Sequence, residues 1–320
     1  MNAQKHVIIT GGGGYIGSRL IDILLSRGVY VTSIGRSPAI TKSSTYQHFT
    51  WQFNTPIPMH AFKTENTWPK IDTFIHLAHV WDIEGNEEDD INLQALKDLL
   101  EVSRRTRISR FIFISSVSSR QDAMNRYGRV KFACESLLDS TSEYPVRIGL
   151  VYGGPKKNIW KSYLTMAAAP ILPMVCVNKI VQPIHINDLA DGLYRLANIK
   201  KINSSLIILG DSKGVTFGQF LKTVAKHKFQ KRLMIVPLPT NLVRFAISII
   251  SRMPFGPNIE QERLDGLVGL PFLNSEASLA QLSLELRDLN EGLKPEPHEH
   301  RKKLLLEART LMASIAGSKK

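Results

Sequence analysis

The chain of 320 residues is 43% apolar and 22% charged, which is ordinary for a globular enzyme. Its length suits one large domain, or a domain with a smaller lobe. The net charge of +13 permits anionic partners such as nucleotides, phosphorylated sugars and anionic membrane surfaces. Because aromatic and basic residues do not interleave as in a nucleic-acid platform, we expect no nucleic-acid partner.

The two cysteines, Cys134 and Cys176, form neither a disulfide framework nor a metal-ligand pattern with histidine, so we expect no metal site. The chain enters a strand almost at once, without the regions of a signal peptide. The longest apolar run, 164–177, contains two prolines and is too short to span a bilayer. These features predict a cytoplasmic protein without stable membrane insertion.

A strand, a glycine-rich turn and a helix open the chain. Val7–Ile9 precede four consecutive glycines, and apolar residues then return at helical spacing. Gly11, Gly14 and Gly17 have the spacing at which a turn admits a pyrophosphate and lets the helix pack on the strand. With a second strand at 30–34, this pattern predicts a βαβ unit that binds a dinucleotide at the amino end of its helix.

The end of the second strand indicates which dinucleotide is preferred. Gly35 stands where NAD-binding folds place a carboxylate for the ribose 2′-hydroxyl, and Arg36 follows it. A guanidinium can fork onto a 2′-phosphate, which a carboxylate would repel. We therefore predict NADP(H) in preference to NAD(H). The alternative is that Arg36 is a solvated loop residue that stacks on adenine.

The next segments complete the predicted sheet on one side. A short strand is expected at 47–53 and a buried one at 73–77, followed by a long helix at 86–107 and a buried strand at 110–116. The last of these ends in two serines, and a hydroxyl there could hold a substrate oxygen. We interpret His79, just after the strand expected at 73–77, as a residue that positions the cofactor rather than as an acid.

Tyr127 and Lys131 are the candidate acid/base pair. In a helix predicted over 124–140 they lie four residues apart, so they share one face. An ammonium beside a phenol favours the phenolate, and so lowers the tyrosine pKa toward the working range of a general acid/base. The alternative for any such pair is a solvated surface contact.

The remaining elements carry less pattern. Strands are expected over 146–151 and 205–210, and helices over 160–169, 216–229, 242–253 and 296–314. The helix at 242–253 is apolar with two arginines and is either a core helix or an interfacial one. The helix at 296–314 is charged. There is no internal repeat and no low-complexity segment.

In these motifs the chain resembles an extended short-chain dehydrogenase/reductase of the NAD-dependent epimerase/dehydratase family, which is rich in nucleotide-sugar enzymes. The resemblance covers about residues 5–210. It rests on Thr10–Gly17, Asp72–Ala78, Asn92, Ser115–Ser116, Tyr127 with Lys131, Arg147–Gly153 and Ile184–Asp191. It implies an α/β fold, a Rossmann-type doubly wound parallel sheet with a smaller C-terminal substrate lobe. The nucleotide-binding domain would comprise 1–152 and 181–210, and the lobe 153–180 and 211–320.

The resemblance also implies roles for individual residues. Ser116 would hold the substrate oxygen, Tyr127 would pass its proton, and Lys131 would hold the nicotinamide ribose while hydride crosses to or from the nicotinamide. The implied cofactor-binding residues are Thr10, Gly11, Gly14, Tyr15, Ile16, Gly17, Arg36, Leu77, Ala78, His79, Ser115, Tyr127, Lys131, Gly149, Leu150 and Val151. The expected substrate is a nucleoside-diphosphate sugar, undergoing 4-epimerisation or reduction of its keto form. Family members often form homodimers.

Two departures from the family pattern keep other functions open. Tyr127 lies only eleven positions after Ser116, about half the usual spacing in nucleotide-sugar members. Val117 and Ser118 stand where sugar 4,6-dehydratases have an Asp-Glu pair, so we do not expect that reaction. One alternative is a reductase of a non-sugar carbonyl, such as a steroid or phenolic ketone. Another is a non-catalytic NADP-binding sensor or assembly protein.

Overall fold

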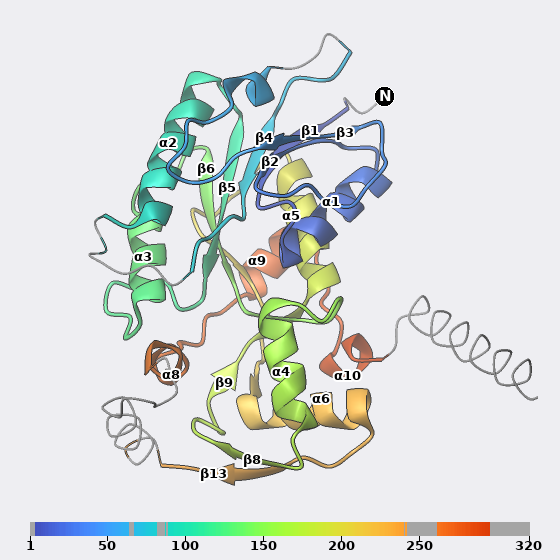
Figure 1. The fold of residues 1–320 in the computed structure, drawn as a ribbon, viewed down its shortest axis with the longest axis vertical. Coiled ribbons are helices and arrows are strands. Elements are labelled where there is room, and N and C mark those ends of the chain that lie inside the picture. Colours follow the sequence, from blue (N-terminus) through green and yellow to red (C-terminus); the bar gives the residue numbers. More distant parts are fainter. Residues whose placement is uncertain are drawn as a thin grey trace, which may run out of the picture.

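A single parallel sheet forms the centre of the molecule (Figure 1). The computed structural model describes residues 4–63, 67–81, 87, 89–239, 241 and 261–294, with the backbone alone for 261–264. The sheet has seven strands in the order β11-β6-β5-β4-β1-β2-β3, and every neighbouring pair is parallel. The strands are β1 (His6–Thr10), β2 (Tyr30–Gly35), β3 (Tyr46–Thr50), β4 (Thr73–His76), β5 (Arg110–Ser116), β6 (Glu143–Ile148) and β11 (Ile207–Leu209).

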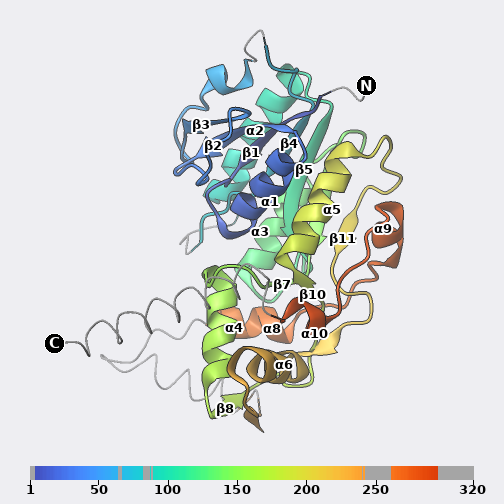
Figure 2. The ribbon, with the colours of Figure 1, turned by 90° about the vertical axis from the view of Figure 1, so that its right-hand side faces the viewer.

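Helices cover both faces of this sheet (Figures 1 and 2). One face carries α1 (Tyr15–Ser26) and α5 (Ile186–Asn198), and the other carries α2 (Ile91–Arg105) and α3 (Arg126–Glu135). A buried apolar cluster lies on each side of the sheet. Strands buried on both faces are apolar throughout rather than alternating, as in β1 and β5. The predicted Rossmann-type doubly wound sheet is therefore confirmed.

The strand order reverses beside β1, which lies between β2 and β4. In such sheets the crevice outside the carboxyl ends of the strands, at this reversal, is where ligands bind. The glycine-rich turn follows β1, and its compactness explains its sequence: a Cβ built at Gly17 would lie 2.2 Å from the carbonyl oxygen of Gly11. Only glycine therefore lets α1 begin this close to the end of β1.

The strand predicted over 146–151 is divided in the structure. β6 ends at Ile148, and β7 (Leu150–Tyr152) pairs with β10 (Pro183–His185) outside the main sheet. The break falls at Gly149, where a Cβ would lie 2.0 Å from the carbonyl oxygen of Gln182. The close approach of a distant segment, rather than any local signal, ends the strand there.

The smaller lobe surrounds helices α4 (Asn158–Ala168) and α6 (Phe217–Phe229). Two small sheets complete it: β8 (Ile171–Met174) with β13 (Met234–Pro237), and β9 (Ile180–Val181) with β12 (Val215–Thr216). Three short helices follow: α8 (Gln261–Val268), α9 (Glu276–Gln281) and α10 (Leu289–Gly292). The helices predicted over 242–253 and 296–314 lie outside the described residues.

The lobe and the main sheet share one apolar core. Leu20 of α1, Leu189 of α5, Leu164 of α4 and Phe220 of α6 all belong to the same buried cluster. Cys134, a residue of α3, is buried in the other cluster. No helix within the described residues combines the length and apolar character needed to cross a bilayer.

Candidate active site

Thr10 joins the glycine-rich turn to the loop after β4. Its buried hydroxyl hydrogen-bonds Nδ1 of His76 at 2.6 Å and accepts from the backbone N–H groups of Leu77 and Ala78 at 3.2 and 3.3 Å. A Cβ on Gly11 would lie 2.8 Å from the nitrogen of Ala78, so the turn and the loop are in direct contact. Thr10 therefore shapes the predicted site, while its hydroxyl is used within the protein.

The amino end of α1 is open to an anion. Gly14 is its N-cap, and neither a capping side chain nor an acidic residue in the first turn occupies its free N–H groups. Tyr15 is turned away: its hydroxyl donates to the carbonyl oxygen of Gly153 at 2.5 Å, and the side chain is buried. Ile16 packs against the apolar core. Tyr15 and Ile16 can thus serve a dinucleotide only through their backbone.

The end of β2 leaves room at the position predicted to select the cofactor. A Cβ on Gly35 would lie 3.7 Å from the nitrogen of Gly11, an ordinary contact distance, so a side chain there would face the turn. Arg36 is exposed and makes no ion pair with a carboxylate in the described part of the chain. This geometry leaves its guanidinium available, and the preference for NADP(H) stays a prediction.

The two serines at the end of β5 have different side-chain contacts. The buried Ser115 hydroxyl donates to the Glu135 carboxylate, which Arg147 holds through contacts of 3.0 Å from Nε and 2.7 Å from NH2. Its hydroxyl is therefore engaged in this polar cluster, and the cofactor-binding role of Ser115 stays a prediction. The Ser116 Oγ instead lies 2.8 Å from that of Ser118, and Ser116 is near enough to Tyr127 to lower the pKa of its phenol.

Lys131 does not acidify the phenol in this structure. Its Nζ donates to the carbonyl oxygen of Ile114 at 2.8 Å and lies 5.9 Å from the centre of the Tyr127 ring. Burial raises the pKa of Tyr127 to about 12, against the opposing effect of Ser116. The predicted lowering of the tyrosine pKa is therefore wrong here, because desolvation outweighs a charge that is already turned to a carbonyl. Burial also lowers the pKa of Lys131 to about 8.

Aromatic rings cover the phenol. Trp81 stacks on Tyr127 with ring centres 4.8 Å apart and an interplanar angle of 23°, and His79 meets the same ring edge-on at 5.1 Å. Trp81 is 61% exposed, so it forms the outer wall of the site. Burial, and then the Lys131 charge, lower the pKa of His79 to about 2. His79 is neutral at physiological pH, which fits a positioning role better than acid catalysis.

A chain of polar contacts holds this aromatic wall in place. The Asn92 amide pairs with the backbone of Val80 through bonds of 2.8 and 3.0 Å. Its Nδ2 also donates to Oδ1 of Asp90 at 2.9 Å, and the other oxygen of Asp90 lies 2.8 Å from NH2 of Arg126. Sequence reasoning identified Asn92 alone. The signals for the others were the capping position of Asp90 before α2 and the place of Arg126 beside Tyr127.

The segment after β6 borders the site through its backbone. Ile148 pairs with Ser116 in register, and the N–H of Leu150 donates to the carbonyl oxygen of Gln182 at 2.8 Å. Gly149 donates to Leu209 at 2.8 Å, and the Val151 side chain is buried in the core. The predicted binding of the cofactor by Gly149, Leu150 and Val151 stays a prediction.

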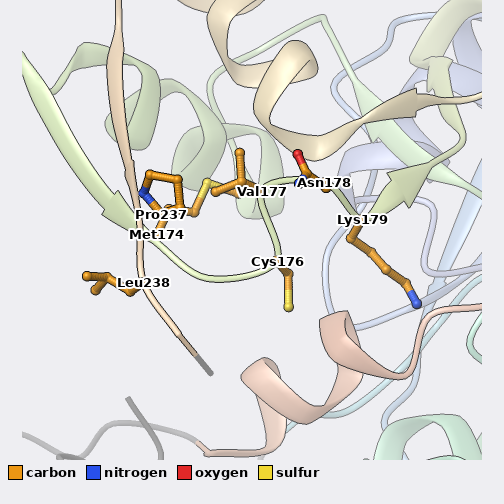
Figure 3. Close-up of a pocket in the computed structure, with 7 residues that line it drawn as sticks. All are labelled: Met174, Cys176, Val177, Asn178, Lys179, Pro237 and Leu238. Carbon is orange, nitrogen blue, oxygen red and sulfur yellow. The ribbon is translucent and has the colours of Figure 1, made fainter. Parts of the chain in front are cut away.

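A hollow of about 430 Å³ lies elsewhere, in the smaller lobe (Figure 3). It is lined by Met174, Cys176, Val177, Asn178, Lys179, Pro237 and Leu238. None of the predicted site residues borders it. In the described residues, no three His, Cys, Asp or Glu side chains gather in a way that could hold a metal ion.

A model of the NAD dependent epimerase/dehydratase family matches residues 7–202. The chain belongs to this family. The match spans the whole glycine-rich turn, the loop after β4, and the helix that carries Tyr127 and Lys131. This membership agrees with the resemblance of the motifs to an extended short-chain dehydrogenase/reductase.

Curated relatives of this epimerase/dehydratase chain have different functions. Subunit 9 of the NADH dehydrogenase [ubiquinone] 1 alpha subcomplex, mitochondrial, of Dictyostelium discoideum is 22% identical over 205 residues, covering 63% of this chain and 55% of the relative. A 3 beta-hydroxysteroid dehydrogenase/Delta 5-->4-isomerase of Mycobacterium tuberculosis is 27% identical over 132 residues, 38% of this chain and 35% of the relative. CDP-abequose synthase of Yersinia pseudotuberculosis is 30% identical over 157 residues, 44% and 52% respectively. The chain thus spans about half or less of each relative.

Solved structures share the fold over nearly the whole chain. A UDP-glucuronic acid 4-epimerase of Bacillus cereus, in complex with UDP-4-deoxy-4-fluoro-glucuronic acid and NAD, is 18% identical with a TM-score of 0.66, covering 93% of this chain and 99% of the other. A human epimerase family protein with NADPH is 18% identical with a TM-score of 0.63, covering 90% and 98%. One of these holds NAD and the other NADPH, so the shared fold does not choose between the two cofactors.

Proposed function

We propose that this chain is an NAD(P)-dependent oxidoreductase or epimerase of a nucleoside-diphosphate sugar, with Ser116, Tyr127 and Lys131 as its catalytic residues. One observation carries the proposal: Ser116 at the end of β5 lies near enough to the Tyr127 phenol to lower its pKa, and Lys131 follows one helical turn farther along α3. Ser116 and Tyr127 lie at the carboxyl edge of the parallel sheet, and the glycine-rich turn after β1 lies at the same edge. Membership of the family and CDP-abequose synthase among the relatives support a sugar substrate.

The residues present fit a dinucleotide. The uncapped amino end of α1 would hold the pyrophosphate, and the exposed Arg36 would reach the adenosine ribose with its 2′-phosphate. A bound nicotinamide supplies the hydride that is exchanged with the substrate carbon. The ammonium of Lys131 would need to leave the Ile114 carbonyl oxygen in order to bind a ribose hydroxyl.

The protonation of Tyr127 favours the direction of reduction. Since burial raises its pKa to about 12, the phenol keeps its proton at neutral pH and can donate it to a carbonyl oxygen that Ser116 holds. Taking a proton from a substrate alcohol would first require a cation closer to the phenol than Lys131 now is. Reduction of a keto-sugar is the proposed reaction in preference to 4-epimerisation, because Arg36 would select NADPH and net reduction needs a cofactor that is exchanged in each turnover.

Replacing the phenol tests this proposal. Tyr127→Phe is expected to bind NADPH as the wild type does, and to lose roughly 10²–10⁴-fold in the rate of NADPH oxidation with a keto-sugar nucleotide, as expected for a lost proton donor. Absorbance of the cofactor measures turnover, and a thermal-shift titration measures binding. Tyr144→Phe is the control, since that hydroxyl donates to Thr141 at the far end of β6. Equal turnover in wild type and Tyr127→Phe would remove the phenol from the mechanism.

A second candidate is a reductase of a non-sugar carbonyl. The aromatic wall of His79 and Trp81 over Tyr127 favours it, because such a wall suits a flat apolar ketone. The similarity to a 3 beta-hydroxysteroid dehydrogenase points the same way. Steroid and phenolic ketones belong in the substrate panel. Turnover of these, with none of any nucleotide sugar, would decide for this candidate.

A third candidate is a non-catalytic NADP-binding assembly protein. The similarity to a subunit of an NADH dehydrogenase subcomplex favours it, and so does the engagement of Lys131 with Ile114 in place of Tyr127. Saturable cofactor binding without turnover of any carbonyl in the panel would decide for it.

A further inference from the structure

Positive charge is concentrated in the smaller lobe. Residues 153–181 and 212–239 contain ten Lys and Arg residues and no Asp or Glu. Since the whole chain carries a net charge of +13, most of the excess lies in these two segments. None of the ten makes an ion pair with a carboxylate of the described residues. Unscreened charge of one sign creates a field that attracts an extended anionic partner.

The same segments expose apolar side chains. Among the described residues, eleven large apolar side chains are exposed, and seven of them belong to these two segments. Four residues form what we call the β8–β13 face: Ile171, Pro173, Met234 and Val236. Ile171 pairs with Met234 and Pro173 with Val236 in register, so they lie on the same side of the two-stranded sheet. Ile171 is 52% exposed and Met234 61%.

The opposite side of this sheet is packed. Ile235 approaches Gly218 at the start of α6, where a Cβ would lie 3.6 Å from its Cδ1, and Met174 is buried. The β8–β13 face therefore points away from the lobe. Figures 1 and 2 place β8 at the end of the molecule opposite the seven-stranded sheet. A flat surface can approach this end without meeting the seven-stranded sheet or α3, which carries Tyr127.

Basic side chains flank the face. Lys231 and Arg232 lie just before β13, separated from it by Leu233. The Nζ of Lys231 donates to the carbonyl oxygens of Ala168 and Ala169, just before β8. Lys231 also lies 5.8 Å from the ring centre of Phe229, which is 37% exposed. Two cations therefore lie beside the exposed apolar side chains at this end of the lobe, a combination typical of surfaces that dock in the headgroup layer of anionic lipids.

We propose that the β8–β13 face docks the protein peripherally on an anionic bilayer surface. Its apolar side chains would enter the headgroup region, and the neighbouring Lys and Arg would bind lipid phosphates. This interaction is independent of the proposed catalytic function.

Charge and chemistry favour lipid over other partners. Two copies joined through this face would bring together lobes that carry ten cations each over these segments, without a carboxylate to compensate. Nucleic acid would be attracted by the charge, but it has no use for exposed Ile171, Met234 and Val236. A bilayer surface satisfies both the charge and the apolar face.

Vesicle flotation of the purified full chain tests the proposal. At about 0.1 M salt, we expect the protein to float with vesicles of phosphatidylcholine and phosphatidylglycerol but not with phosphatidylcholine alone, and to be released at about 0.5 M salt, where screening is strong. The double variant Met234→Glu with Val236→Glu should bind at least about tenfold more weakly, because the apolar contacts are lost and like charge is added. Arg232→Gln should also weaken binding, because a cation beside the face is lost.

The matched control is Ile40→Glu, which adds a carboxylate at a fully exposed apolar residue outside the lobe and should leave flotation unchanged. Circular dichroism and the melting temperature establish that each variant is folded. Absence of flotation by the wild type, or equal flotation by a folded Met234→Glu/Val236→Glu protein, overturns the proposal. So does a wild-type dimer that this variant dissociates, or binding of a DNA duplex in place of the vesicles.

Discussion

Lys131 carries a positive charge into a buried position, where its ammonium bonds the carbonyl oxygen of Ile114. The neighbouring Tyr127 and Lys131 show how far spacing alone predicts chemistry. Four residues on a helix place two side chains on one face, and the structure does so. Which partner the ammonium takes depends on the strand behind it, and the Ile114 carbonyl oxygen lies closer than the phenol ring.

The buried lysine makes stability depend on pH. Its pKa is lowered from 10.5 to about 8, so between these values the unfolded chain holds a proton that the folded chain has released. Stability of the wild type relative to Lys131→Met should therefore rise with pH across this window. We expect the melting temperature of the wild type minus that of Lys131→Met to be higher at about pH 9.5 than at about pH 7.5.

Lys97→Met serves as the control for this measurement, since Lys97 is an exposed residue of α2 and its replacement should give a difference that does not change over the same range. If the melting temperature of the wild type relative to Lys131→Met decreased from about pH 7.5 to about pH 9.5, a lowered lysine pKa would be contradicted.

Gly35 offers a test of cofactor preference at a single residue. Its Cβ position faces the glycine-rich turn with room for a side chain, so Gly35→Asp should place a carboxylate near the 2′-position of the adenosine ribose. We expect the dissociation constant for NADP to rise about tenfold or more relative to that for NAD, since like charges about 4 Å apart near a surface repel by about 4 kcal/mol. Titration of the two cofactors measures the ratio.

The control is Ser26→Asp, which adds the same charge at the opposite end of α1 and should leave this ratio unchanged. An unchanged ratio in Gly35→Asp would mean that the end of β2 does not meet the ribose.

At the scale of elements, the loop after β4 owes its shape to the start of α2. Asn92→Ala would remove both bonds to Val80, and leaving buried backbone groups unpaired costs about 1–3 kcal/mol each. We expect a lower melting temperature, a shift in tryptophan emission as Trp81 leaves the Tyr127 ring, and slower turnover. Asn198→Ala is the control, because its amide bonds only the Tyr194 carbonyl of its own helix. Wild-type emission and turnover in Asn92→Ala would show that the brace is dispensable.

Elements whose signals are local were predictable from sequence. The turn at Gly11–Gly17 and the helix of Tyr127 each depend on residues a few positions apart, and the structure has both. The break at Gly149 was not predictable, because Gln182, far along the chain, causes it. The same holds for Ser115, which differs from Ser116 only in facing Glu135, and for Trp81, whose stacking on Tyr127 depends on the contacts of Asn92.

At the scale of the whole molecule, charge and chemistry are separated. The site group at Ser116 and Tyr127 lies at the edge of the seven-stranded sheet, whereas the cationic segments 153–181 and 212–239 belong to the smaller lobe. Composition alone revealed the excess of basic residues but not its position, since the lobe brings together stretches from two parts of the chain. The structure shows that the excess positive charge lies on one lobe of the molecule.

The core shared by α1, α5, α4 and α6 limits how the molecule can move. A hinge needs a boundary with few buried contacts, and a continuous hydrophobic interior provides none. Admission of a substrate would then come from rotation of side chains such as Trp81, not from a clamshell opening of two halves. Recombination between relatives could not exchange this lobe as a unit, because the residues with which it packs on the sheet would have to change at the same time.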